Sequence, residues 1–203
     1  MSSLHEKLEQ AIWAGRALFE RGKVTGSSAN MSFLHEGKLY ITGSGTCFGR
    51  LCEDSFAVLE GERLLSALRP SKELPLHRLL YKNCPESGAV IHTHSSFITY
   101  WSCVLEDAPE CVLPSPTPYL AMKVGRLGFV PYEKPGTQAL FDAFESRLQA
   151  GMRAYVLKNH GLILADDSIL NAFYGVEEAE EAAHNAWLLN MNTDRQPSQS
   201  AGC

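Results

Sequence analysis

The segment 90–94, which reads Val-Ile-His-Thr-His, constrains the fold of this chain more than any other segment. Its apolar start is typical of a β-strand, and the two-residue period of a strand places His92 and His94 on the same face. Two imidazoles on one face can bind a single cation, and histidine is the commonest metal ligand in proteins. A metal site needs further ligands, which must come from distant segments of the chain.

The rest of the chain alternates helical patterns with short strand-like runs. Because no internal repeat or low-complexity linker divides it, we expect one domain over residues 1–192, followed by a polar tail over 193–203. This alternation favours the α/β class, with helices packed on a mixed sheet. The patterns predict helices over 4–21, 74–82, 97–105 and 137–148, a long helix after Ser168, and strands over 38–42, 57–59, 63–65, 154–157 and 162–165.

The composition excludes several classes of function. With 45% hydrophobic residues in 203, the chain can bury a sizeable core, and the net charge of -5 offers no basic field for nucleic acid or an anionic membrane. No apolar segment is long enough to cross a bilayer and no signal peptide is visible, so a cytoplasmic location is expected. The six cysteines contain no C-x-x-C pair and are expected to be free thiols. The remaining expectation is a protein that acts on a small molecule.

Two residues are the best candidates for completing the metal site. His160 lies in a turn between two apolar runs, where Gly161 is expected to let the backbone reverse and direct the imidazole off the sheet edge. Glu73 lies at the start of a helix, with Ser71 as a cap and Pro75 in the first turn. Three neutral imidazoles and one carboxylate suit a cation that polarises a substrate carbonyl, which suggests enediolate chemistry.

Other polar residues receive structural interpretations. His77 follows Glu73 by four residues and can share its helix face, so we expect it to pack beside the site without binding the metal. The acidic run on the last predicted helix is most simply a solvated face. It consists of Glu177, Glu178, Glu180 and Glu181.

A second group of segments suits an anion such as phosphate. Small residues expose backbone N–H groups over 25–32 and 42–46, the Asn30 amide adds a donor, and Ser71-Lys72 stands at a helix start. Lys72 adds a full positive charge there, and the helix dipole disfavours a cation at that position unless an anion is bound. None of these loops matches a Walker motif or a dinucleotide fingerprint, so they give no support to nucleotide binding.

Together these motifs resemble the class II aldolase/adducin family, in order and approximate spacing, over about residues 5–190. The glutamate, the His-x-His pair and the His-Gly pair are each weak signals but are highly specific in combination. The motifs that carry the resemblance are Asn30 with Ser32, Thr42-Gly43-Ser44-Gly45, Pro70-Ser71-Lys72-Glu73, His92-Thr93-His94 and Lys158-Asn159-His160-Gly161.

The resemblance implies a three-layer α/β/α fold around a central mixed, largely antiparallel sheet. It implies a metal-dependent carbon–carbon lyase with one Zn²⁺ per subunit, or Mn²⁺ or Co²⁺, bound by His92, His94, His160 and Glu73. Glu73 is expected to transfer protons as well, and Tyr119 matches the catalytic tyrosine, which usually reaches a neighbouring subunit of a homotetramer. Phosphate binding is implied for Asn30, Ser44, Gly45 and Ser71, with Lys72 in place of a serine found in the aldolases.

Within this family, the segments 70–73, 117–125 and 130–136 most resemble the branch that decarboxylates 3-oxo-tetronate 4-phosphates. A phosphorylated sugar acid is then the expected substrate, and dihydroxyacetone phosphate and CO2 are the expected products. A sugar-phosphate aldolase or epimerase of the fuculose-phosphate or ribulose-phosphate type remains the main alternative. A non-catalytic interaction module, as in the adducin branch, is disfavoured because all four metal-site residues are present.

Overall fold

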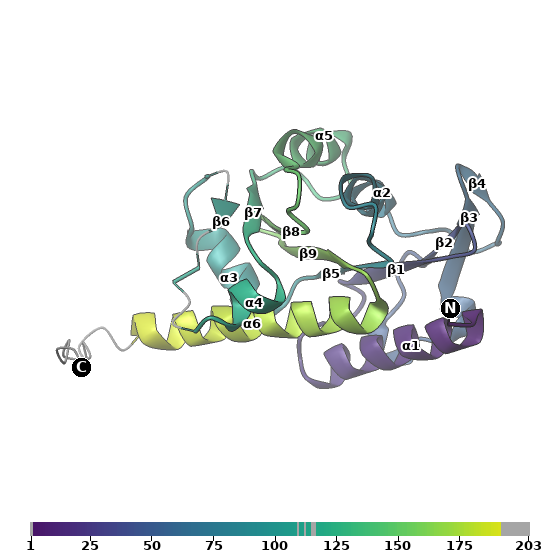
Figure 1. Ribbon diagram of the computed structural model, residues 1–203, viewed down its shortest axis with the longest axis horizontal. Coiled ribbons are helices and arrows are strands. Elements are labelled where there is room, and N and C mark those ends of the chain that lie inside the picture. Colours follow the sequence, from purple (N-terminus) through teal and green to yellow (C-terminus); the bar gives the residue numbers. More distant parts are fainter. Residues whose placement is uncertain (1, 109, 112, 115–116, 192–203) are drawn as a thin grey trace.

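A single mixed sheet forms the middle layer of the computed structural model, which describes residues 2–108, 110–111, 113–114 and 117–191 (Figure 1). The predicted tail over 193–203 lies outside the described residues. In space the strands follow the order β4-β3-β2-β1-β5-β9-β8-β7-β6, and all neighbours are antiparallel except β7 and β8. The strands are β1 (Asn30–His35), β2 (Lys38–Thr42), β3 (Phe56–Glu60), β4 (Arg63–Leu64), β5 (Ala89–Thr93), β6 (Glu110–Cys111), β7 (Leu127–Val130), β8 (Ala154–Leu157) and β9 (Gly161–Asp166).

Helices cover both faces of this sheet (Figure 1). Helices α2 and α5 pack on one face, whereas α1, α3 and α6 pack on the other. The predicted three-layer α/β/α architecture with a largely antiparallel sheet is therefore confirmed. The helices are α1 (Leu4–Glu20), α2 (Leu74–Asn83), α3 (Ser96–Val104), α4 (Tyr119–Lys123), α5 (Gln138–Arg147) and α6 (Ile169–Met191), and two short 3-10 turns cover Phe48–Arg50 and Glu53–Ser55.

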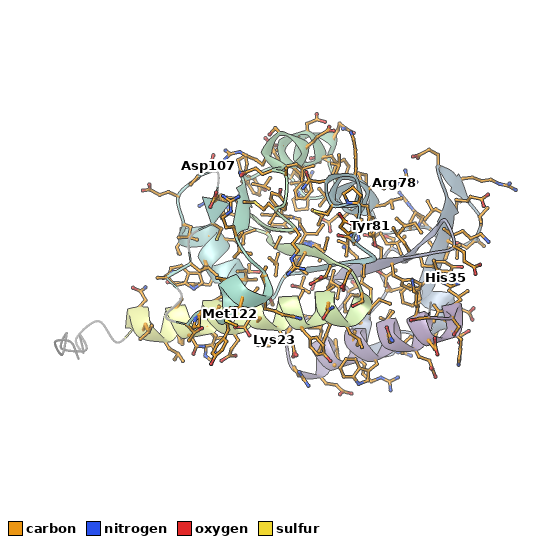
Figure 2. The ribbon with its side chains drawn as sticks, in the orientation of Figure 1. Lys23, His35, Arg78, Tyr81, Asp107 and Met122 are labelled. Carbon is orange, nitrogen blue, oxygen red and sulfur yellow. The ribbon has the colours of Figure 1, made fainter. Side chains whose placement is uncertain are left out.

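The strand period divides the buried residues between two cores, and side chains fill the space on each side of the sheet (Figure 2). Within β5, Ile91 packs in the core under α1 and α6, while its neighbour Val90 packs in the core under α2 and α5. In β9, Leu164 and Ile163 divide in the same way. Because His92 shares the parity of Val90, its side chain points toward the α2 face of the sheet.

Strand β1 corrects one sequence prediction. Residues 25–32 were expected to form an anion-binding loop, but the strand already begins at Asn30. The physical reason is alternation: Met31 and Phe33 are almost completely buried in the core beside α1, while Asn30 and Ser32 face the opposite side. The sequence patterns also did not identify β6, β7 or α4 as separate elements.

Glu180 corrects a second prediction, since it is 1% exposed and not part of a solvated face. Its carboxylate accepts hydrogen bonds from the backbone N–H groups of Phe97 at 3.0 Å and Ile98 at 2.9 Å. A buried carboxylate bound to the orphan N–H groups of a helix start satisfies both partners and complements the helix dipole. Glu180 therefore holds the start of α3, two residues after His94.

Within the described ranges, no helix is both long enough and apolar enough to cross a membrane.

Candidate metal centre

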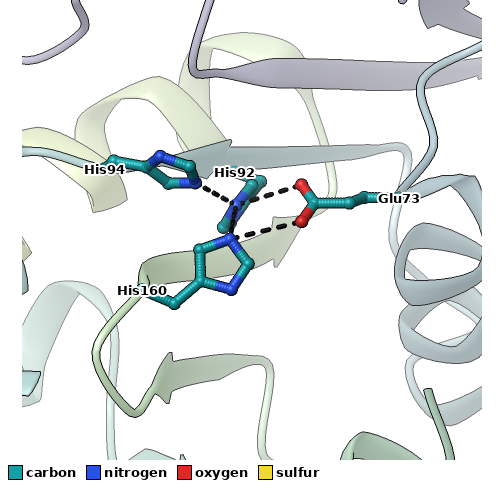
Figure 3. A group of neighbouring side chains, drawn as sticks. All are labelled: Glu73, His92, His94 and His160. Carbon is teal, nitrogen blue, oxygen red and sulfur yellow. Dashed lines mark hydrogen bonds and ion pairs between the residues drawn. The ribbon is translucent and has the colours of Figure 1, made fainter. Parts of the chain in front are cut away.

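Four side chains from three separate segments meet at one point (Figure 3). They are the three predicted histidine ligands and the predicted carboxylate: one potential ligand atom of each lies within 4.8 Å of those of the other three. The Nε2 atom of His92 lies 2.9 Å from Nε2 of His94 and 3.3 Å from Nε2 of His160. The Oε2 atom of Glu73 lies 3.2 Å from His92 Nε2, and its Oε1 atom lies 3.2 Å from His160 Nε2. The structure thus brings all four predicted ligands together.

The ends of regular elements position these side chains. His92 is in β5, and His94 follows the last residue of that strand, still on the predicted face. Glu73 is the N-cap residue of α2, whose first turn contains Pro75 as expected. The predicted cap is present in a modified form, because the Ser71 hydroxyl accepts a hydrogen bond from the Glu73 backbone N–H at 3.3 Å. The carboxylate therefore stands on a locally fixed backbone.

The turn that carries His160 is built differently from the prediction. The positive φ of 53° falls on Asn159 and not on Gly161. Asparagine tolerates this left-handed conformation better than most residues, and the turn is closed by a hydrogen bond from His160 N–H to the Leu157 carbonyl at 3.1 Å. Gly161 has another role, because a Cβ atom at this position would lie 2.2 Å from the Thr93 carbonyl oxygen.

We expect Gly161→Ala to disturb the metal site as well as the fold. The added methyl must push against the backbone of Thr93, next to His94, and overpacking of this kind costs about 1–3 kcal/mol. The expected result is a lower unfolding free energy in urea together with weaker Zn²⁺ binding. Gly15→Ala in α1 is the matched control, since its added methyl meets the ends of the flexible side chains of Leu51 and Met31. Equal zinc affinity in both variants would contradict the expectation.

Burial keeps the imidazoles of His92 and His94 neutral, as metal binding requires. Burial lowers the pKa of His94 to about 4 and lowers the pKa of His92 well below its ordinary value. Burial alone raises the pKa of the Glu73 carboxyl, but His92, His160 and the Asn30 amide act in the opposite direction, and the net pKa lies well below its usual range. Near neutral pH the site therefore presents neutral imidazoles from His92 and His94 and an ionised carboxylate from Glu73.

The geometry of the donor atoms fits a divalent cation. His92 Nδ1 donates to the Leu162 carbonyl at 2.8 Å, which leaves the Nε2 lone pair directed at the other ligands. Zn–N bonds of about 2.0–2.1 Å give tetrahedral edges of roughly 3.3–3.4 Å, close to the three separations of 3.2–3.3 Å that involve His160 and Glu73, while His92 and His94 lie closer at 2.9 Å. Lone pairs that face one another without a proton or cation repel, so a bound cation explains the convergence of three Nε2 atoms.

The residues predicted to bind phosphate gather on one side of Glu73. The loop after β2 is held against the segment before α2 by hydrogen bonds from Ser44 N–H to the Arg69 carbonyl at 2.9 Å and from Ser71 N–H to the Thr42 carbonyl at 3.1 Å. Gly45 has a φ of 81°, which glycine adopts without strain, and Lys72 is exposed. The amide of Asn30 donates to Glu73 Oε2 at 2.9 Å. The loop after β2 is therefore held beside the segment that leads into α2, and Asn30 is the member of this group that contacts the Glu73 carboxylate.

Tyr119 lies elsewhere on the molecule. It is 58% exposed at the start of α4 and lines a surface hollow with Lys23, Met122 and Tyr174. Figure 2 labels Lys23 and Met122 on this side of the molecule, next to α6. None of the four metal-site residues lines that hollow. The structure of one chain therefore does not bring Tyr119 to its own metal centre.

Sequence reasoning missed the polar residues that stand behind Glu73. His77 was expected to pack beside the site and does so, but its contact with Ser32, and the contact of Ser32 with Tyr81, were not identified. A signal was present in the sequence: Glu73, His77 and Tyr81 are spaced by four residues along one helix face, and Asn30 and Ser32 are spaced by two along one strand face. A polar stripe on the helix and a polar stripe on the strand are consistent with a contact between the two elements, but the pairing itself is seen only in the structure.

The fold and the buried histidine–carboxylate cluster define the class of the protein as a class II aldolase type with a possible metal site. The chain belongs to the family described as "Class II Aldolase and Adducin N-terminal domain", whose model matches residues 9–187. The predicted family resemblance is thereby confirmed.

Curated relatives and solved structures agree with this assignment. The chain is 35% identical over 185 residues to the 3-oxo-tetronate 4-phosphate decarboxylase of Haemophilus influenzae, covering 90% of this chain and 87% of the relative. It is 31% identical over 183 residues to the L-fuculose phosphate aldolase of Methanocaldococcus jannaschii, covering 90% and 96%. The crystal structure of YgbL from Klebsiella pneumoniae matches with a TM-score of 0.87 at 34% identity, covering 93% and 92%. Both curated relatives carry the names of carbon–carbon lyases, and the chain is placed in that enzyme class.

Proposed function

We propose that this protein is a metal-dependent lyase that decarboxylates 3-oxo-tetronate 4-phosphate to dihydroxyacetone phosphate and CO2. The observation that carries the proposal is the convergence of His92, His94, His160 and Glu73, which suits Zn²⁺ or a similar divalent cation. The similarity to decarboxylases of that name over 90% of the chain supports the substrate. When bound, the cation supplies a Lewis acid that stabilises negative charge developing on the substrate oxygens.

The residues around the centre have distinct roles in this proposal. The C–C bond to the carboxylate breaks, CO2 leaves, and the electron pair remains on the substrate as an enediolate until a proton is added to carbon. Glu73 stands beside the histidines with its carboxylate ionised, so it holds no proton of its own; in this proposal it takes one from solvent water and passes it to the substrate carbon. Ser44, Gly45, Ser71 and Asn30 bind the phosphate, and the exposed Lys72 binds a negative group of the substrate.

A sugar-phosphate aldolase is the second candidate, because relatives of that name cover a similar share of the chain. The two reactions leave the same electron pair on the substrate but release different fragments. We expect the zinc-loaded protein, incubated with each epimer of 3-oxo-tetronate 4-phosphate, to release CO2 and dihydroxyacetone phosphate in equal amounts from one of them. Absence of CO2, with an aldehyde released from L-fuculose 1-phosphate, would favour the aldolase.

We further propose a cytoplasmic homotetramer in which Tyr119 of one subunit serves the metal centre of its neighbour. The exposed cluster of Tyr119, Met122 and Tyr174 supports a surface that another subunit covers. If so, inactive Tyr119→Phe and His94→Ala subunits should complement each other when they are mixed and reassembled. Random mixing should restore activity in roughly a quarter of the sites, because each intact site then takes its ligands and its tyrosine from different variants. If mixtures that have reassembled into oligomers of the wild-type size regain no activity, the shared site would be contradicted.

A further inference from the structure

A chain of buried polar side chains leads away from Glu73 between β1 and α2. The Asn30 amide lies 2.9 Å from Glu73 Oε2, and the Asn30 carbonyl oxygen lies 2.5 Å from His77 Nε2. On the other side of the imidazole, His77 Nδ1 lies 2.7 Å from the Ser32 hydroxyl. That hydroxyl lies 2.9 Å from the phenol oxygen of Tyr81, which Figure 2 labels below α2. His77 is completely buried, and Asn30 and Ser32 are nearly so.

The chemistry of the groups fixes the direction of every hydrogen bond in this chain. An ionised carboxylate can only accept, so the Asn30 NH2 group must face Glu73, and its carbonyl oxygen must face His77. The imidazole of His77 must therefore carry a proton on Nε2 and donate it to Asn30.

The outer half of the chain agrees with this tautomer. Burial lowers the pKa of His77 to about 4, so the ring is neutral and Nδ1 keeps a lone pair that accepts from Ser32. Burial raises the pKa of Tyr81, whose oxygen accepts a hydrogen bond from the Val90 backbone, so its remaining proton is available for the Ser32 oxygen. Each member thus has a partner, and a fully satisfied network rigidifies the groups at its end.

We propose that His77 is a positioning residue for Glu73, and that it acts by fixing the amide of Asn30 so that the NH2 group holds the carboxylate against His92 and His160. Without the Nε2 proton, the Asn30 amide is free to rotate and present its oxygen to the carboxylate, which repels it. This inference rests on the proposed metal-dependent function, because it assigns a role toward the same centre.

Two substitutions at one position separate positioning from packing. His77→Leu removes the donor, whereas His77→Gln keeps an N–H group that can reach Asn30. We expect His77→Leu to weaken Zn²⁺ binding, measured by competition with a chromogenic chelator, by about 10-fold to 100-fold. We expect kcat to fall by a similar factor and KM to change less than kcat, because Ser44, Gly45, Ser71 and Lys72 are untouched and only Asn30 of the proposed phosphate-binding residues is released. His77→Gln should recover both quantities to within about threefold of the wild type.

Leu80→Ala is the matched control, because Leu80 is fully buried in α2 and takes no part in the polar chain. It should lower the melting temperature while leaving zinc affinity unchanged. Wild-type zinc affinity in His77→Leu, or an equal defect in His77→Gln and His77→Leu, would overturn the inference.

A measurement on the wild-type protein avoids any failure of the variants to fold. The ¹⁵N shifts of the His77 ring, in the metal-free and zinc-loaded protein, should show a proton on Nε2 and none on Nδ1. The opposite tautomer would overturn the inference even if the enzyme is active. Failure of the wild-type protein to bind one equivalent of zinc would instead overturn the proposed function, so the two failures are distinguishable.

Discussion

His94→Ala is expected to lose the metal and the activity together. Removing one of three convergent imidazoles leaves only two permanent nitrogen ligands, because in the proposed mechanism the Glu73 carboxylate must also transfer protons. A Lewis acid that contributes several kcal/mol to transition-state stabilisation corresponds to a rate loss of about a thousandfold or more. Zinc content by elemental analysis and CO2 release should fall in parallel.

His184→Ala is the control for this substitution, because His184 stacks on Phe97 and lies outside the metal cluster. It should retain one zinc per subunit and wild-type turnover. A His94→Ala protein with full zinc content would show that the fourth ligand is not needed and would contradict the geometry proposed for the centre.

Glu73→Gln is expected to keep the metal but stop turnover. The amide is close in shape to the carboxylate and can still accept the Asn30 hydrogen bond, while three imidazoles hold the cation. The neutral amide cannot take up or deliver a proton, and loss of general acid–base catalysis costs about 10²-fold to 10⁴-fold in rate. Zinc content near one equivalent with kcat reduced by that factor is the expected pair of measurements.

The control for Glu73→Gln is Glu62→Gln, which changes an exposed carboxylate in the turn between β3 and β4 that pairs with Arg78 of α2. It should leave kcat unchanged. A fully active Glu73→Gln enzyme would show that another group carries the proton, and the assignment of Glu73 as the proton-transfer residue would fall.

The residues of the candidate metal centre were predictable because their signals are local. The His-x-His pair lies at the end of a strand, whose two-residue period places both side chains on one face. Glu73 lies between Ser71 and Pro75, and because proline is tolerated only in the first turn of a helix, these residues mark where the helix begins. Their convergence was not predictable from periodicity. It depends on β5 pairing with both β1 and β9, which are 40 or more residues away on either side, and it was supplied by the family resemblance.

The errors share one cause, which is that burial in the fold overrides the preference of a single residue. Glu180 looks solvent-exposed in an acidic run, yet α3 packs against α6 and offers two backbone N–H groups that require an acceptor. Asn30 and Ser32 look like loop residues, yet they alternate with Met31 and Phe33, whose side chains are buried in the core. Gly161 was expected to bend the chain, but it is needed for the close approach of the Thr93 carbonyl.

The metal-site residues and the residues proposed to bind the substrate lie on different kinds of element, which has a practical consequence for engineering the enzyme toward new substrates. The proposed metal ligands are attached to a strand, a helix start and a closed turn, whereas Ser44 and Gly45 stand on an exposed loop. A Cβ at Gly136 would lie 3.6 Å from the Lys72 side chain, so the loop 131–136 runs beside that lysine. Random libraries confined to the loops 44–46 and 131–136 can therefore vary what is recognised while the reactive centre is inherited unchanged.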